Sequence, residues 1–80
     1  MFLEIVTPEK KIFSGEIRLI QAPGSDGSFE IMQNHAPIIS TLQEGTLKII
    51  SPEGEKTMYN IRGGVVEANK NKIIVLAEMA

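Results

Sequence analysis

The class of the fold follows from the segment between Ala22 and Gly45, which reads APGSDGSFEIMQNHAPIISTLQEG. This segment holds two of the four prolines and three of the seven glycines of the chain. Proline removes a backbone donor and clashes inside a helix, and glycine lowers helix stability. With Pro8 and Pro52 outside the segment, the chain keeps few windows that are long enough for a helix.

Between these breakers the chain is rich in β-branched residues, with twelve isoleucines, four valines and four threonines. Such side chains favour a pleated surface. Short apolar stretches separated by turn signals predict an all-β sandwich or barrel. No repeat and no linker divides the sequence, so residues 1–80 are expected to form a single domain.

The expected strands are Phe2–Val6, Ile12–Ser14, Glu16–Ala22, Ser28–Met32, Ala36–Leu42, Thr46–Ser51, Lys56–Arg62, Val65–Ala68 and Lys72–Glu78. The apolar run Ile73–Ala77 should be central or covered on both sides, because its apolar residues would point to both faces. Residues Ala36–Leu42 could also form one helical turn, although short extended pieces are favoured. Hairpins are expected across Pro52–Glu55 and across Asn69–Asn71.

Three glycine-containing positions carry specific expectations. Gly15 permits a bend or a bulge. The pair Gly63-Gly64 interrupts two strand-like runs, which indicates either a positive φ or a close approach of two backbones. The segment Pro23–Gly27 is expected to be a loop.

The composition excludes several classes of protein. The net charge is -2, whereas nucleic-acid binders of this size are usually clearly basic. Without cysteine the chain has neither a disulfide framework nor a thiolate metal site. The longest apolar run is far shorter than the roughly 20 residues of a spanning helix, and the amino terminus has no signal-peptide layout. A cytoplasmic chain is the default expectation.

No arrangement of side chains in the sequence predicts catalysis. His35 is the only histidine, and with Asp26 and Glu30 it could form a carboxylate-rich site. The favoured interpretation is a turn residue that hydrogen-bonds a neighbour. No serine lies in a nucleophile-elbow pattern, and Gly24–Gly27 carries an acid where a phosphate loop would hold phosphate. We therefore expect no catalytic residue, no metal and no cofactor.

Binding of another protein is the better hypothesis. Five apolar residues gather within eleven positions beside a turn-rich stretch, namely Met32, Ala36, Ile38, Ile39 and Leu42. Adjacent residues of a strand point to opposite faces, so either Ile38 or Ile39 should face away from the core. An exposed apolar patch of this kind marks a protein contact.

Short motifs also occur in a characteristic order. They are Leu3–Pro8, Phe13–Glu16, Ala22–Gly24, Gly27–Phe29, His35–Pro37, Gly45 before Leu47–Ile49, Gly63-Gly64 with Glu67, and Val75–Glu78. In this order and spacing, over essentially all 80 residues, they resemble the epsilon subunit family of F-type ATP synthases.

The resemblance implies a flattened β-sandwich or barrel of about ten short strands. It also implies a non-catalytic subunit of the rotor's central stalk, placed between the gamma subunit and the polar loops of the membrane c-ring. Such a subunit helps to couple proton flow to ATP synthesis and contacts the catalytic alpha and beta subunits only indirectly. Its expected location is the cytoplasmic face of the bacterial inner membrane, to which it attaches through its partners.

The resemblance further assigns residues to contacts. The gamma-facing set is Thr7, His35, Ala36, Pro37, Ile38, Ile39, Ser40, Thr41 and Leu42. The c-ring-facing set is Ser25, Asp26, Gly27, Ser28, Phe29 and Glu30, whose acids could meet arginine in the c-ring loops. The glycines expected to be structural are Gly15, Gly45, Gly63 and Gly64.

Two departures from the family pattern carry expectations. Glu30 stands where glycine is usual, so this strand either lacks a bulge or uses the charge of Glu30 for the ring contact. Typical bacterial epsilon chains continue into two inhibitory helices, whereas this sequence ends at Ala80, so we expect no such helical hairpin and no inhibition from it. The alternative function is a biotinyl-type or lipoyl-type carrier domain, for which Lys70 would be the modified tip residue.

Overall fold

The computed structural model describes all 80 residues, and it contains eight β-strands and no helix. The strands are β1 (Phe2–Val6), β2 (Lys11–Glu16), β3 (Leu19–Gly24), β4 (Gly27–Met32), β5 (Ile38–Leu42), β6 (Gly45–Ile50), β7 (Lys56–Asn69) and β8 (Lys72–Met79). The all-β prediction is confirmed. Residues Ala36–Leu42 provide one extended strand, as favoured, and both expected hairpins form.

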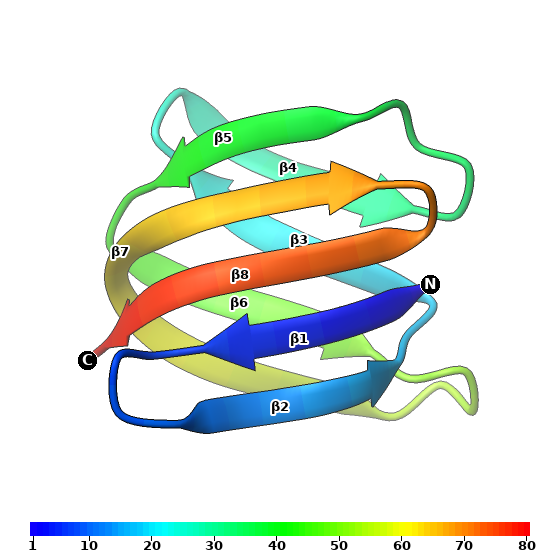
Figure 1. Cartoon of the computed structure of the whole chain (residues 1–80), viewed down its shortest axis with the longest axis horizontal. Helices are drawn as coiled ribbons and strands as arrows, with labels where there is room; N and C mark the ends of the chain where they lie inside the picture. The colour runs from blue at the N-terminus through cyan, green and yellow to red at the C-terminus, as the bar shows by residue number, and fades with distance from the viewer.

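The strands form two layers that share β7 (Figure 1). The front sheet has the order β2-β1-β8-β7-β5, and the back sheet has the order β4-β3-β6-β7. Every pairing is antiparallel except that of β1 with β8, which is parallel. A single residue pair, Gly24 with Leu42, joins β3 to β5 along the remaining seam.

β7 turns from one layer into the other near its middle. Its residues 56–61 pair with β6, and its residues 61 and 63–69 pair with β8, with a register shift between Ile61 and Gly63 in the β8 pairing. In Figure 1 this strand curves round one side of the molecule from the back to the front. At Gly64 an added Cβ would collide with the carbonyl oxygen of Leu76 and lie 3.0 Å from the Cα of Ala77.

The expected close backbone approach at Gly64 is therefore confirmed, and the positive φ is wrong because only Gly27 and Gly54 have one among the glycines. The expected interruption is also wrong. β7 is one strand of 14 residues and joins two of the nine strands expected from the sequence, so the domain has eight strands. The count of about ten that the resemblance implied is too high.

Two further expectations about turns and bulges are corrected. Pro23 and Gly24 belong to β3, and the expected loop shrinks to the two-residue turn Ser25-Asp26. The carbonyl oxygen of Pro23 accepts a bond from the Gln43 amide at 2.8 Å. In a strand the N–H and C=O of one residue point to the same side, so the N–H that proline lacks is not needed for the pairing with β4. Gly15 shows no bulge and an added Cβ would make only ordinary contact, at 3.5 Å from Phe13.

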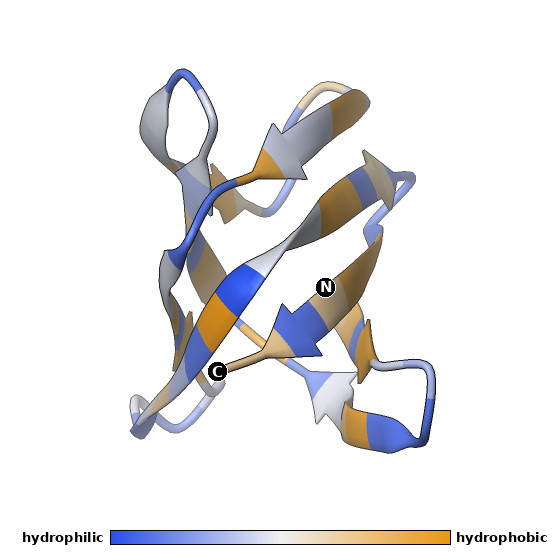
Figure 2. Cartoon of the chain, turned by 90° about the vertical axis from the view of Figure 1, so that its left-hand side faces the viewer, coloured by the Kyte–Doolittle hydropathy of each residue, from blue (hydrophilic) through white to orange (hydrophobic).

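The core lies between the two sheets and follows from the alternation of apolar and polar residues along the strands (Figure 2). Its fully buried large side chains are Leu3, Ile5, Ile20, Ile31, Leu47, Ile61, Val66, Ile73 and Val75. Gly45 is needed at the edge of this core, because a Cβ there would lie 2.8 Å from the Cβ of Pro23. β8 is central in the front sheet, as expected, but its outward side chains are not covered.

Candidate functional site

The outer side of the front sheet carries a group of apolar side chains that stay exposed or half-buried in the folded chain. We call it the apolar face and define it by Val6, Ile39, Val65, Ile74 and Leu76. Ile39 is 73% exposed, Leu76 55% and Val65 38%. Alternation within each strand sends these residues outward while their neighbours fill the core.

Strand register brings these residues together from four strands. Val6 of β1 pairs with Leu76 of β8, which pairs with Val65 of β7. Thr41 of β5 continues this line beyond Val65. Paired residues on neighbouring strands have their Cβ atoms about 5 Å apart, so the line is continuous across the sheet.

Shallow hollows flank the apolar face at two places. One of about 370 Å³ lies between Val6–Pro8 and Leu76–Glu78. Another of about 370 Å³ lies between Pro37–Ile39 and Glu67–Asn69. Both are open surface depressions, which suit protruding side chains of a partner better than an enclosed small molecule.

The predicted gamma-facing residues fall in different places. Ile39 and Thr41 belong to the outer side, and Pro37 lines a hollow beside it. Ile38 packs against the core, which confirms that only one isoleucine of the pair faces away. Leu42 is buried, so its side chain offers no contact surface, and Ser40 is half-buried on the inward side.

Thr7 is also largely enclosed. Its hydroxyl donates to the Lys10 carbonyl oxygen at 3.0 Å and accepts from the Lys10 amide at 3.2 Å. The side chain therefore closes the turn between β1 and β2, and Thr7 lines the hollow beside Leu76 and a second one beside Met79. Its contribution to a contact would come mainly from placing this turn.

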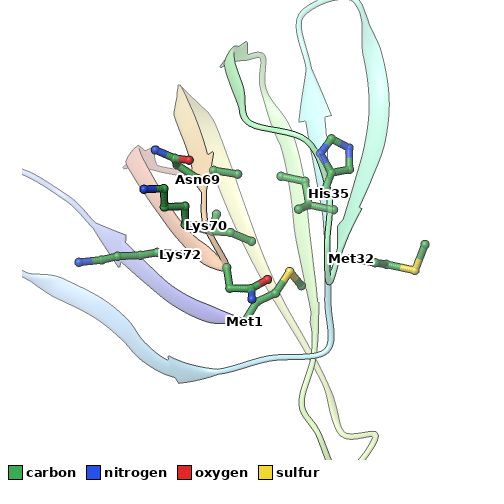
Figure 3. Close-up of a pocket in the computed structure, with 10 residues that line it drawn as sticks. Met1, Met32, His35, Asn69, Lys70 and Lys72 are labelled. Carbon is green, nitrogen blue, oxygen red and sulfur yellow. The ribbon is translucent and has the colours of Figure 1, made fainter.

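His35 lies at the opposite end of β5 from Thr41. Its Nδ1 is 2.7 Å from the Ala36 carbonyl oxygen, so the ring bonds a neighbouring residue, as the turn interpretation predicts. The hollow beside it has only about 10 Å³ of space, barely enough for one water. Lys70 and Lys72 line the same hollow, but their ammonium groups point away from His35 (Figure 3).

His35, Lys70 and Lys72 therefore do not point toward a shared position where one ligand could bind all three. The side chains of the chain form no group of three or more acids, histidines or cysteines that could hold a metal ion. Lys70 occupies the tip of the β7–β8 turn with φ 51°, between two asparagines, and nothing in its surroundings favours a carrier role. No element of the structure is a helix with the length and apolarity that crossing a membrane requires.

The predicted c-ring-facing residues form the β3–β4 hairpin. Asp26 is at its exposed tip, and Ser28 and Glu30 are on the outer side of β4. Phe29 points inward against the core. The register of the hairpin is regular throughout, so the strand has no bulge at Glu30.

Hydrogen bonds tie this acidic hairpin to the edge of the apolar face. The Ser25 amide donates to the Thr41 carbonyl oxygen at 3.0 Å. The Thr41 hydroxyl donates to the Ser25 hydroxyl at 2.8 Å. The two predicted contact regions are thus distinct surfaces that are joined at one point.

Sequence reasoning missed most of the apolar face. Val6, Val65, Ile74 and Leu76 were expected only as strand residues. A signal was present in the last strand, whose apolar residues occupy both faces. Such a run predicts a strand that is central or covered on both sides; β8 is central, and within this chain only its inner side is covered.

Fold and surface define a small all-β sandwich domain with an open apolar face and no ligand cavity. The family model described as "ATP synthase, Delta/Epsilon chain, beta-sandwich domain" matches residues 1–80. The chain therefore belongs to the delta/epsilon family of ATP synthase chains. It is an epsilon-type chain, a non-catalytic subunit, as the sequence predicted.

Individual relatives support this membership. The ATP synthase epsilon chain of Chlorobium limicola is 42% identical over 76 residues, which is 95% of this chain and 86% of the relative. That of Caulobacter vibrioides is 38% identical over 81 residues, with 100% and 92% covered. That of Maridesulfovibrio salexigens is 44% identical, and there the chain spans only 56% of the relative.

Solved structures share the fold. A chain of the Euglena gracilis mitochondrial ATP synthase superposes with a TM-score of 0.89 at 21% identity, over 94% of this chain and 48% of that one. A chain of the Tetrahymena thermophila mitochondrial ATP synthase, in a structure of central stalk and c-ring, gives 0.81 at 20% identity, over 98% and 63%. At these identities the likeness concerns the fold alone.

Proposed function

We propose that this chain is a rotor subunit of a bacterial F-type ATP synthase, which links the gamma subunit to the c-ring in the central stalk. It takes no part in bond chemistry and helps to couple proton flow to ATP synthesis. It sits on the cytoplasmic face of the inner membrane, held there by its partners. Family membership supports this proposal, and the Tetrahymena chain with the same fold comes from a structure of central stalk and c-ring.

The observation that carries the proposal is the apolar face. Folding does not require these side chains to be apolar, since they point away from the core. Full burial of a valine, leucine or isoleucine side chain is worth about 1.5–3 kcal/mol, so docking the half-exposed ones supplies a sizeable part of a stable contact. We assign this face to the gamma subunit, because Ile39 of the expected contact set belongs to it and Thr41 of that set lies beside Val65 at its edge.

The acidic hairpin is assigned to the c-ring. Asp26 and Glu30 are exposed and make no ion pair within the chain. Exposed ion pairs contribute about 0–1 kcal/mol each, so these acids orient the domain on basic loops more than they hold it there.

The test compares charges placed on the two outer faces. Ile39→Asp combined with Leu76→Asp should lower affinity for purified gamma subunit by about 100-fold or more, because both anchors become charged. Met58→Asp is the matched control, since Met58 is 57% exposed on the outer side of the back sheet. All three side chains are exposed, so circular dichroism and thermal melting should show folded variants. Unchanged co-purification of the double variant with gamma would overturn the proposal.

A further inference from the structure

One charged side chain interrupts the apolar face. Glu67 projects from β7 to the outer side, where its register partners are Ile39 on β5 and Ile74 on β8. Hence an exposed carboxylate is flanked by isoleucine on both neighbouring strands.

No basic side chain of the chain forms an ion pair with Glu67. The only ion pairs of the chain are those of the amino terminus with Glu16 and of Lys11 with Glu4. Glu4 differs from Glu67 in this respect. It lies on the other side of Ile74 in the same row, and its carboxylate forms an ion pair with the Lys11 ammonium at 2.7 Å. Of the two acids in this row, Glu4 forms an ion pair within the chain and Glu67 forms none.

Two hollows meet at Glu67. The one of about 370 Å³ on the β5 side and a second of about 200 Å³ on the β8 side both have Glu67 and Asn69 in their walls. Lys72 lines the smaller hollow but makes no ion pair with the carboxylate. A long side chain from a partner could enter either hollow and reach Glu67.

A wholly apolar partner would bury this carboxylate without compensation, which is strongly unfavourable. A partner with a basic side chain at this point would turn the same group into an anchor. Arginine suits the position better than lysine, since its planar guanidinium bonds a carboxylate through two donors and is more weakly hydrated.

We infer that the partner seated on the apolar face presents a basic side chain, preferentially arginine, to Glu67, which makes this residue the specificity determinant of the interface. The inference rests on the proposed function insofar as that partner is the gamma subunit. Glu67 then selects among apolar surfaces by rejecting those that carry no cation at the matching place.

The experiment measures gamma binding of the wild-type chain, Glu67→Gln and Glu67→Lys at low and high salt. Glu67→Gln should weaken binding about 10- to 100-fold, because it leaves the partner's cation unpaired, and Glu67→Lys should weaken it more. Much of the wild-type salt dependence should be lost in Glu67→Gln. Glu53→Lys, in the exposed turn between β6 and β7, makes the same charge change as Glu67→Lys and should bind like wild type.

The outcomes distinguish the role of Glu67 from the assignment of the apolar face to the gamma subunit. If Ile39→Asp with Leu76→Asp abolishes binding while both Glu67 variants bind like wild type, only the role of Glu67 is overturned. Tighter binding by Glu67→Gln would also overturn it, since the wild-type carboxylate would then be buried in the interface without a basic partner. If the double variant binds normally, the assignment of this face to gamma fails first.

Discussion

The two outer faces of the sandwich differ, although the same alternation builds both. The front sheet presents the apolar face, whereas the middle of the back sheet presents Gln21, Glu30, Lys48 and Asn60. The outer side of the back sheet has fewer exposed large apolar residues, Met32 and Met58, and beside Met32 the half-buried Leu19 and Ile50 follow in register at one end of the sheet. The inward positions of both sheets are alike, so the difference cannot come from the needs of the core.

This contrast indicates that the residue types at outward positions are determined by what the domain binds and not by the requirements of folding. A solvated sheet face is normally polar. Contiguous apolar patches on small soluble domains mark interaction sites, and the front sheet has one. Substitutions at the β7 crossing, at the acidic hairpin and at Lys11, the ion-pair partner of Glu4, test whether the two faces depend on each other.

The largest effect is expected where β7 passes from one face to the other. Gly64→Ala should destabilise the domain by about 3 kcal/mol, because the new Cβ meets backbone of β8 that cannot move aside. Chemical denaturation measures the loss. Gly15→Ala is the control and should change stability by less than about 1 kcal/mol, since its Cβ has ordinary space. Equal stability of the two variants would show that the β7 crossing tolerates a side chain.

A smaller effect is expected at the acidic hairpin. Asp26→Asn with Glu30→Gln should weaken binding to isolated c-ring by at most about 30-fold and reduce its salt dependence, because exposed charges contribute about 0–1 kcal/mol each. Binding to gamma should stay unchanged. Glu55→Gln, in the exposed turn before β7, is the control. A loss of gamma binding with intact c-ring binding would reverse the assignment of the two surfaces.

The smallest effect concerns the internally paired acid of the front sheet. The hydrogen bond from Lys11 lowers the pKa of Glu4 below its ordinary value of 4.5. A carboxyl whose folded pKa is depressed stabilises the fold fully above its unfolded pKa and loses that contribution as pH falls through the folded value. Lys11→Met should therefore raise the Glu4 pKa toward 4.5.

Carbon NMR titration of the Glu4 carboxyl measures this change directly. The stability difference between wild type and Lys11→Met should be constant near neutral pH and shrink below about pH 4.5. Lys10→Met is the matched control, because Lys10 makes no ion pair. An unchanged titration in Lys11→Met would exclude the hydrogen bond as the cause.

Local patterns in the sequence predicted the features that depend on neighbours along the chain. The prolines and glycines excluded helices, and the turns at Pro52–Glu55 and Lys70-Asn71 gave the two hairpins. The exposure of one isoleucine at positions 38 and 39 followed from strand geometry alone.

Features that depend on long-range pairing could not be predicted. The apolar face requires β1 to lie beside β8 in parallel, and these strands are at opposite ends of the sequence. The continuity of β7 through Gly63-Gly64 depends on which partner takes over at the register shift. For the same reason the isolated character of Glu67 is visible only once Ile39 and Ile74 are placed on either side of it.

The passage of β7 through both sheets also determines how the domain carries mechanical load. Its 14 residues are one covalent backbone, paired with β6 at one end and with β5 and β8 at the other. A torque applied to the front sheet therefore reaches the back sheet along covalent bonds as well as through the close-packed core, which has low compressibility. Two sheets connected only by loose loops would bend before they transmitted such a torque. We therefore expect this sandwich to act as a rigid connection between partners bound to its two outer faces.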